Sequence, residues 1–314
     1  MIDRMRPFTK ADLAEAAELC RREIPHLPWT TEILVDRIFD DPDFDPELNP
    51  TAWRGGRLVG LACGAPPNVD LQTAGGVKLF AVAHDMTRQG IAGQLLDHIE
   101  DRLAASGALE SFAVIAGNNR FMQGLDLRYT AALCFLEARG YGRVGDGMDM
   151  DVKLTSLSLD TTEVEAVLAE THGVRLRRAT RDDYDSVWAY AERTFDVPRP
   201  EVSTVPVGRR WAYLATSGLR RNPPTLHVAE QLGEITGFTV TDVAAPGRLG
   251  PMGVSSELRG LGVGAVLLKR GLADLRSQGL ETGVIYGAGP YAFYATTVGA
   301  VANAVFWILR KELI

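Results

Sequence analysis

The sequence VSSELRGLGVGAVLL occupies residues 254–268, and the sequence VAHDMTRQGIAGQLL occupies residues 82–96. The two stretches align without gaps at an offset of 172 residues, and the same offset continues to Gly107 and Gly279. Repetition at one fixed offset indicates a duplicated structural unit. We therefore interpret the chain as two copies of one domain.

A pair of helix-start signals supports the duplication. Residues 4–12 and 175–183 each place a strand-like run before a Thr-x-x-Asp sequence. Such a sequence predicts a helix N-terminus of the capping-box type, with Asp in place of the usual Glu or Gln. We expect an amphipathic helix to follow each one, over about residues 11–22 and about residues 183–194.

Each copy also contains a hairpin signal, a glycine-containing turn between strand-like runs, at residues 53–60 and 228–237. The shared order of elements predicts an α/β fold of the α+β kind, in which a twisted mixed sheet is flanked by helices. We expect an N-terminal domain with a degenerate motif over 1–158, a polar linker over 159–172, and a C-terminal domain with the intact motif over 173–314.

The repeated stretch carries the features of an anion site in the second copy. A strand through residues 252–254 leads into RGLGVG at residues 259–264, and a helix is expected from about Ala265. Glycines permit positive φ and close ligand approach, and the free amides of a helix start bind phosphate. A tight turn without a ligand is one alternative. A dinucleotide site is another, but Gly-x-Gly-x-x-Gly would need glycine at Leu267.

The spacing Arg-x-x-Gly-x-Gly, here Arg259, Gly262 and Gly264, resembles the signature of the GNAT N-acetyltransferase superfamily. The tandem arrangement and size are similar to those of mycothiol synthase, a two-domain member. The resemblance implies acetyl-CoA as cosubstrate, with its pyrophosphate on the loop and its pantetheine arm along the preceding strand. The binding residues that it implies are Met252, Gly253, Val254, Arg259, Gly260, Leu261, Gly262, Val263 and Gly264.

The first copy departs from this signature, because Thr87 stands at the Arg position while Gly90 and Ala92 still fit. Arg88 is one residue later and could replace the missing guanidinium. A weaker second cofactor site is therefore expected at Phe80, Ala81, Val82, Arg88, Gln89, Gly90, Ile91, Ala92 and Gly93.

The resemblance also implies a general acid. Phe293-Tyr294 followed by Gly299 places Tyr294 where the family's tyrosine protonates the leaving thiolate, whereas the first copy has Leu136 there. A tyrosine that only packs on the sheet is the alternative. A general base must take a proton from the amine, and Glu230 is our candidate. Three other carboxylates remain open: Glu201, Glu234 and Asp242.

The resemblance implies an acetyl-CoA-dependent N-acetyltransferase, in which an amine attacks the thioester directly, and the intact motif and Tyr294 favour the second copy as the catalytic one. The acceptor is expected to be a small-molecule or peptide amine. The alternative function is a non-catalytic acyl-CoA-binding sensor or scaffold. Acceptor identity and oligomeric state stay open.

Composition restricts the partners and the location. The net charge of −7 argues against nucleic acid as a partner. Residues 1–172 carry 16 Lys and Arg against 27 Asp and Glu, which gives −11, and residues 173–314 carry 17 against 13, which gives +4. No membrane segment or signal peptide is apparent, so a cytoplasmic location is expected. The three cysteines are expected to be buried free thiols, and the five histidines show no metal-ligand spacing.

Overall fold

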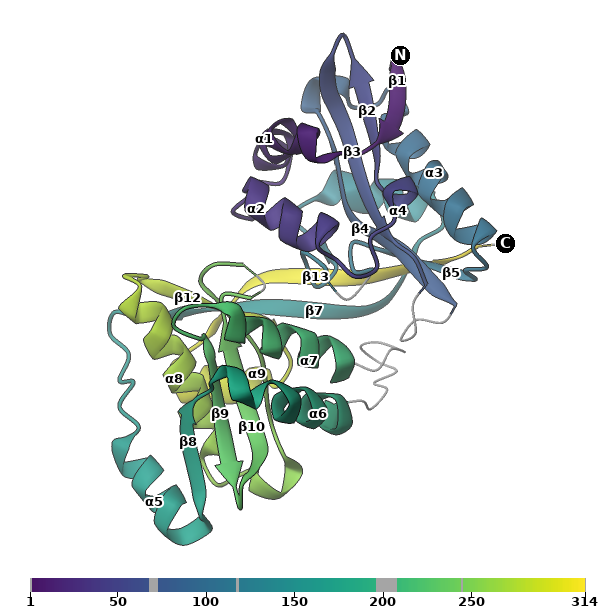
Figure 1. Cartoon of the computed structure of the whole chain (residues 1–314). Coiled ribbons are helices and arrows are strands. Elements are labelled where there is room, and N and C mark those ends of the chain that lie inside the picture. Colours follow the sequence, from purple (N-terminus) through teal and green to yellow (C-terminus); the bar gives the residue numbers. More distant parts are fainter. Residues whose placement is uncertain (1, 68–72, 117–118, 196–207, 244, 314) are drawn as a thin grey trace. The chain divides into compact units, whose positions relative to one another are not determined.

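The computed structural model describes residues 2–67, 73–116, 119–195, 208–243 and 245–313. It shows an α/β protein with two compact units, one made of Met1–Asp146 with Phe306–Ile314 and the other of Gly147–Val305 (Figure 1). Each unit has a mixed sheet flanked by helices, which confirms the predicted fold class.

In the first unit the strands follow the order β1-β2-β3-β4-β5-β13, and β6 pairs beside β13. Only the β4–β5 pair is parallel. The bounds are β1 Arg4–Pro7, β2 Pro50–Arg54, β3 Arg57–Ala65, β4 Ala74–Val82, β5 Glu110–Ala113, β6 Leu125–Asp126 and β13 Val301–Glu312. The helices are α1 Leu13–Glu23, α2 Thr31–Leu34, α3 Ile91–Ala105 and α4 Thr130–Ala138, with short turns η1 Lys10–Asp12, η2 Val35–Phe39, η3 Pro46–Leu48 and η4 His84–Met86.

In the second unit the strands follow the order β7-β12-β11-β10-β9-β8, and only the β11–β12 pair is parallel. The bounds are β7 Gly142–Lys153, β8 Val174–Arg178, β9 Leu226–Gln231, β10 Glu234–Thr241, β11 Arg248–Val254 and β12 Thr282–Ala288. The helices are α5 Thr162–His172, α6 Tyr184–Phe195, α7 Gly208–Ser217, α8 Val263–Ser277 and α9 Tyr291–Val298, with short turns η5 Arg181–Asp183, η6 Gly218–Arg220 and η7 Ser256–Leu258.

The two units exchange their last strands. Strand β7, which ends the first copy in sequence, pairs with β12 through Met150 and Ile285, and β13 pairs with β5 through Leu309 and Ala113. The compact units therefore differ from the linear division expected at residues 158 and 173. The physical reason is that both final strands present the same kind of antiparallel edge, so either can complete either sheet.

The segment expected to be a plain linker forms a helix over most of its length. Helix α5 covers Thr162–His172, and its buried Leu168 packs with Val263 and Val266 of α8. Glu165 also forms an ion pair with Arg270 of α8, with an oxygen–nitrogen distance of 2.5 Å. The segment thus belongs to the helical layer of the second unit.

The predicted local signals are confirmed. Thr9 with Asp12 and Thr180 with Asp183 form capping boxes, and α1 and α6 follow them. The hairpin between β2 and β3 turns through Gly55 and Gly56, which both have positive φ (56° and 76°), a conformation that glycine adopts without steric cost.

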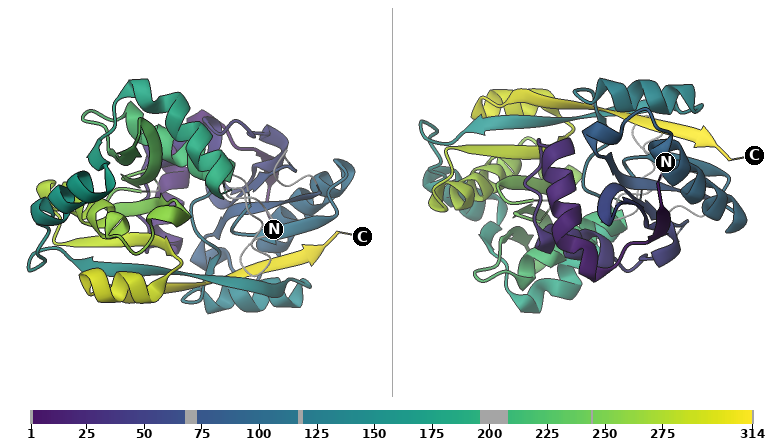
Figure 2. Two further views of the ribbon diagram at one scale, coloured as in Figure 1. Left: turned by 90° about the horizontal axis from the view of Figure 1, so that it is seen from below. Right: turned by 90° about the horizontal axis from the view of Figure 1, so that it is seen from above.

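The second unit has an apolar layer on each side of its sheet. Phe238 and Val240 of β10 pack under α6 and α7, whereas Leu249 of β11 and Ile285 of β12 pack under α8 and α9. Figure 2 shows α6 and α7 on the opposite side of the strands from α9. Side chains of β11 and β12 therefore point either toward the α6–α7 layer or toward the α8–α9 layer.

The cysteine prediction is right at two positions and wrong at the third. Cys20 and Cys63 are buried free thiols, but Cys134 is exposed. Cys134 lies on α4 among apolar residues in sequence, yet the helix turns it outward because only one side of a surface helix is covered.

Candidate active site

The Arg259 loop of the second unit connects β11 to α8 in a conformation that requires glycine. Gly260 and Gly262 have φ of +80° and +98°, and α8 begins directly at Val263. The amide of Val266 donates to the Gly262 oxygen over 3.1 Å, so the amides of the preceding turn are left for an outside acceptor. This geometry suits a phosphate group.

The charged residue of the loop is available for such a ligand. Arg259 is exposed, and no ion pair to it is found among the residues that the structure describes. A Cβ added at Gly260 would meet no atom within 4 Å, so there is open space above the loop backbone. The exposed Arg259 belongs to the same loop as these backbone amides, and together they can bind a pyrophosphate.

Strand β11 separates from its parallel neighbour after a short paired region. The pairs with β12 are Arg248 with Val284 and Leu249 with Ile285, whereas β11 stays paired with β10 as far as Val254. Beyond Leu249, the β12-facing edge of β11 has no strand partner within the described chain. Backbone groups around Met252 and Val254 can thus pair with an extended ligand arm.

Two close contacts fix the walls around this edge. A Cβ at Gly253 would lie 2.2 Å from the ring of Phe195, so glycine is needed for α6 to pack on β11. A Cβ at Gly264 would lie 3.5 Å from the ring of Phe293, which brings α9 beside the start of α8. The predicted binding residues 252–264 are therefore brought together with Phe293, next in sequence to Tyr294.

Tyr294 lies on α9 and is 6% exposed. It belongs to the apolar cluster that contains Leu249 and against which Met252 packs, so the sheet brings it close to β11. Burial raises the pKa of Tyr294 to about 12. Its hydroxyl therefore keeps its proton at neutral pH, as a general acid must.

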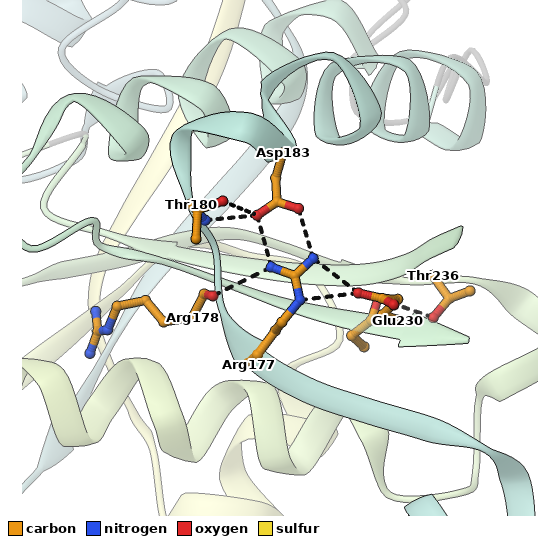
Figure 3. A network of polar contacts seen from close by, with 7 residues as sticks. Arg177, Arg178, Thr180, Asp183, Glu230 and Thr236 are labelled. Atoms are coloured by element: carbon orange, nitrogen blue, oxygen red, sulfur yellow. Dashed lines mark hydrogen bonds and ion pairs between the residues drawn. The ribbon is translucent and has the colours of Figure 1, made fainter. Parts of the chain in front are cut away.

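The structure places the predicted base, Glu230, in an ion-pair network at the β8–β9 edge (Figure 3). Its Oε2 accepts hydrogen bonds from Nε and Nη2 of Arg177 over 3.0 and 2.9 Å. Arg177 also donates to both oxygens of Asp183 over 2.8 and 2.7 Å, and this contact, more than any other, lowers the pKa of Asp183 to about 2. Glu230 is thus held by the Arg177 guanidinium, and its role as general base stays a prediction.

The other carboxylates offer no better base. Asp242 accepts hydrogen bonds from the Gly247 amide and from Gln278, over 2.8 and 2.9 Å. Glu234 is exposed at the hairpin, and Glu201 lies outside the described residues. The contacts of Glu230 with Arg177 and of Asp242 with Gln278 could not be predicted, because each joins residues that are far apart along the chain.

The loop between β4 and α3 of the first unit has a backbone similar to that of the Arg259 loop, but Thr87 stands in place of the arginine. Thr87 and Arg259 share nearly the same φ, −66° and −67°, and Gly90 has φ of +79° before α3. Arg88 has φ of +60° at the position of Gly260, a conformation that is unfavourable for a residue with a side chain. The region from Phe80 to Gly93 thus keeps the cradle, with Arg88 exposed beside it.

A buried lysine that sequence reasoning missed marks the first unit. Lys78 is the extra residue where the β3–β4 register shifts, and its offset of 172 residues leads to Gly250. Its side chain forms an ion pair with the buried Asp41 and donates to the Arg37 oxygen over 2.6 Å. Lysine within an apolar strand was the available signal. The position that Gly250 holds on β11 of the second unit is therefore occupied in the first unit by Lys78 and its bonded partners.

In each unit, a strand leads through a glycine loop into a helix, so the second unit repeats the arrangement of the first. The chain belongs to the acetyltransferase (GNAT) family, whose model matches residues 13–125 and 184–293. The two matched regions confirm the duplicated, two-domain resemblance. No curated protein sequence matches the chain.

Solved structures with similar folds support the tandem arrangement. A GCN5-related glucosamine N-acetyltransferase region of a fungal multi-domain enzyme has a TM-score of 0.76 and 16% identity, over 98% of this chain and 38% of that one. A GCN5-related N-acetyltransferase from Sphaerobacter thermophilus has a TM-score of 0.67 and 18% identity, over 99% and 95%. A tandem GNAT protein from clavulanic acid biosynthesis has a TM-score of 0.66 and 16% identity, over 99% and 98%.

Two further features of the described chain bear on partners. None of its helices combines the length and apolar character that crossing a membrane requires. Among the same residues, no group of three or more His, Cys, Asp or Glu side chains is arranged to hold a metal ion.

Proposed function

We propose that the protein is an acetyl-CoA-dependent N-acetyltransferase whose second unit carries the working site. The observation that carries the proposal is the pairing of the free Arg259 loop with the buried, protonated Tyr294 around one separated strand. The first unit has Thr87 and Leu136 in these places, and neither can perform the same role.

The residues divide the reaction between them. Bound acetyl-CoA supplies an activated acetyl group as its thioester. The amides and Arg259 of the loop hold the pyrophosphate, and the free edge of β11 aligns the pantetheine arm. Backbone amides near Met252 polarise the thioester carbonyl as the amine attacks it. A C–N bond forms, the C–S bond breaks, and Tyr294 donates its proton to the leaving sulfur. The proton that the amine loses passes to solvent water, from which Tyr294 regains its own.

Charge separates the sequence halves more than the compact units. Residues 173–314 carry +4 and residues 1–172 carry −11, whereas the second unit, Gly147–Val305, carries 16 Lys and Arg against 18 Asp and Glu, which gives −2, and the first unit carries 17 against 22, which gives −5. The second unit is thus the less acidic one, and salt should weaken any attraction of the cofactor phosphates to its arginines. In the first unit, Lys78 is already bonded to Asp41 and to the Arg37 oxygen, which favours a structural role or weak cofactor binding for that unit. Weak binding without transfer would correspond to the alternative sensor function.

The acceptor is a small-molecule or peptide amine, and the proposal includes a cytoplasmic location. The fungal region of similar fold is described as a glucosamine N-acetyltransferase. Amino sugars therefore belong in the first set of acceptors to be tested, beside simple amines and peptides.

The test is release of free CoA thiol from acetyl-CoA in the presence of an amine panel that includes amino sugars, amino alcohols and peptides. We expect at least one amine to accelerate release and to yield its N-acetyl product by mass spectrometry. Acetyl-CoA binding with no transfer to any amine would instead support the sensor function.

A further inference from the structure

Three polar side chains come together on neighbouring strands of the second unit, outside the residues used so far. They are Asp149 of β7, Tyr286 of β12 and Arg248 of β11. Strands β11 and β12 pair through Arg248 with Val284 and through Leu249 with Ile285, and Tyr286 is the next residue of β12. The three residues therefore lie where the two parallel strands begin to separate.

Their side chains share one face of the sheet. Met150, Leu249 and Ile285 pack in the cluster under α8 and α9. Because successive strand residues alternate between faces, Asp149 and Arg248 face the opposite side, toward α6 and α7, and Tyr286 is placed with them by the contact of its ring with the Arg248 guanidinium. This is the face that Phe195 covers at Gly253. The three residues thus lie beside β11, the strand proposed to align the cofactor, on the face of the sheet opposite to Tyr294.

The group contains hydrogen-bonding capacity that the protein does not use. Tyr286 is 6% exposed, and its hydroxyl has no partner among the described residues. The Nη1 of Arg248 forms an ion pair with Asp149 over 3.3 Å, without the geometry of a hydrogen bond. The Arg248 guanidinium lies 4.9 Å from the centre of the Tyr286 ring, so the unpartnered hydroxyl belongs to a ring with a cation beside it.

Asp149 balances the charge of this group and braces the strand. Its Oδ1 accepts the Gly287 amide over 2.8 Å, at the position where the β12–β7 register shifts. Asp149 also forms the ion pair with Arg248. A ligand carboxylate placed here would compete with Asp149 for the guanidinium, whereas a hydroxyl or carbonyl oxygen would accept the Tyr286 hydrogen bond without adding a charge.

From this geometry we infer that Tyr286 and Arg248 bind an uncharged oxygen of the acceptor, so that the preferred substrates are amines with a neighbouring hydroxyl or amide oxygen. The inference rests on the proposed function and specifies its substrate class. A buried polar group without a partner destabilises a fold, so a ligand oxygen that accepts the Tyr286 hydrogen bond would gain the interaction that the described residues leave unmade. By strand register, the first unit has Gly76 and Val114 in these places, so only the second unit carries the group.

The experiment uses acceptors matched in shape. L-Alaninol is compared with sec-butylamine, which replaces its hydroxyl by a methyl group, and with L-alanine, which carries a carboxylate. trans-2-Aminocyclohexanol and cyclohexylamine, which differ by one neighbouring hydroxyl, form a second pair. We expect kcat/KM to fall about 10- to 100-fold when the oxygen is removed, because the site's donors are then left unpaired.

The variants separate this role from a structural one. Tyr286→Phe should lower kcat/KM for L-alaninol by a similar factor, mainly through KM, and leave sec-butylamine within about threefold. Its Tm should not fall, since the lost hydroxyl has no protein partner. Tyr141→Phe is the matched control, because that buried hydroxyl contacts Ser111 and Glu100 over 2.8 and 2.9 Å. It should lower Tm and leave the acceptor ratio unchanged.

Each outcome decides the matter. Equal use of L-alaninol and sec-butylamine, preference for L-alanine, an unchanged ratio in Tyr286→Phe, or a lowered Tm in that variant would overturn the inference and leave acetyl transfer standing. Acetyl-CoA binding without transfer to any of these amines would contradict the proposed function, and the inference with it.

Discussion

Replacement of Tyr294 by phenylalanine removes one hydroxyl and keeps the buried ring. The ring packs in the apolar cluster of the second unit, so the core should be preserved. Loss of a general acid costs about 10²- to 10⁴-fold in rate, which corresponds to about 2.7–5.4 kcal/mol in the activation free energy. We therefore expect kcat to fall by that factor while acetyl-CoA binding stays within about twofold.

The assay combines steady-state CoA release with acetyl-CoA binding by calorimetry. Tyr184→Phe, at an exposed position of α6, is the control and should behave as the unaltered protein. Because the pKa of Tyr294 is raised to about 12, its proton is present throughout the pH range from 6 to 9. An unchanged kcat in Tyr294→Phe would refute the assignment of this residue as the acid.

Three further results are expected. Gly262→Val should abolish most of the thermal protection by acetyl-CoA, because a β-branched residue at φ of +98° is strained and its Cβ would come within 3.3 Å of Val164; an unchanged melting shift would place the cofactor elsewhere. Gly90→Val, the equivalent change in the first unit, should leave turnover within a few-fold, and a dead enzyme would reverse the assignment of units. The depressed pKa of Asp183, about 2, supplies stability that is present above pH 4 and lost as pH falls toward 2, so Asp183→Asn should flatten acid unfolding in that window, and a denaturation series with the original slope would contradict this.

The elements that the sequence predicted correctly are those with local causes. The capping boxes at Thr9 and Thr180 and the glycine loop at Gly262 depend on residues within a few positions of one another. Their conformations follow from side-chain hydrogen bonds and from the freedom of glycine at positive φ. Because the two copies share these signals, each local prediction made in one copy could also be made in the other.

The features that escaped prediction depend on distant pairing. Nothing along the chain decides whether β7 pairs with its own copy or with β12, because both choices satisfy the same backbone groups. Glu230 reads as a free carboxylate until the fold brings Arg177 to it. Likewise, Tyr286 and Arg248 are separated along the sequence and become neighbours only through the parallel pairing of β11 and β12.

The central claim is that acetyl-CoA binds to the loop of the second unit. Hydrogen–deuterium exchange with and without acetyl-CoA, followed at peptide resolution, tests it most directly, since bound phosphate and pantetheine protect the amides that they contact. The account predicts slowed exchange over residues 252–264, with little change over residues 80–93. Protection confined to residues 80–93, or no protection of either segment at saturating acetyl-CoA, would contradict it.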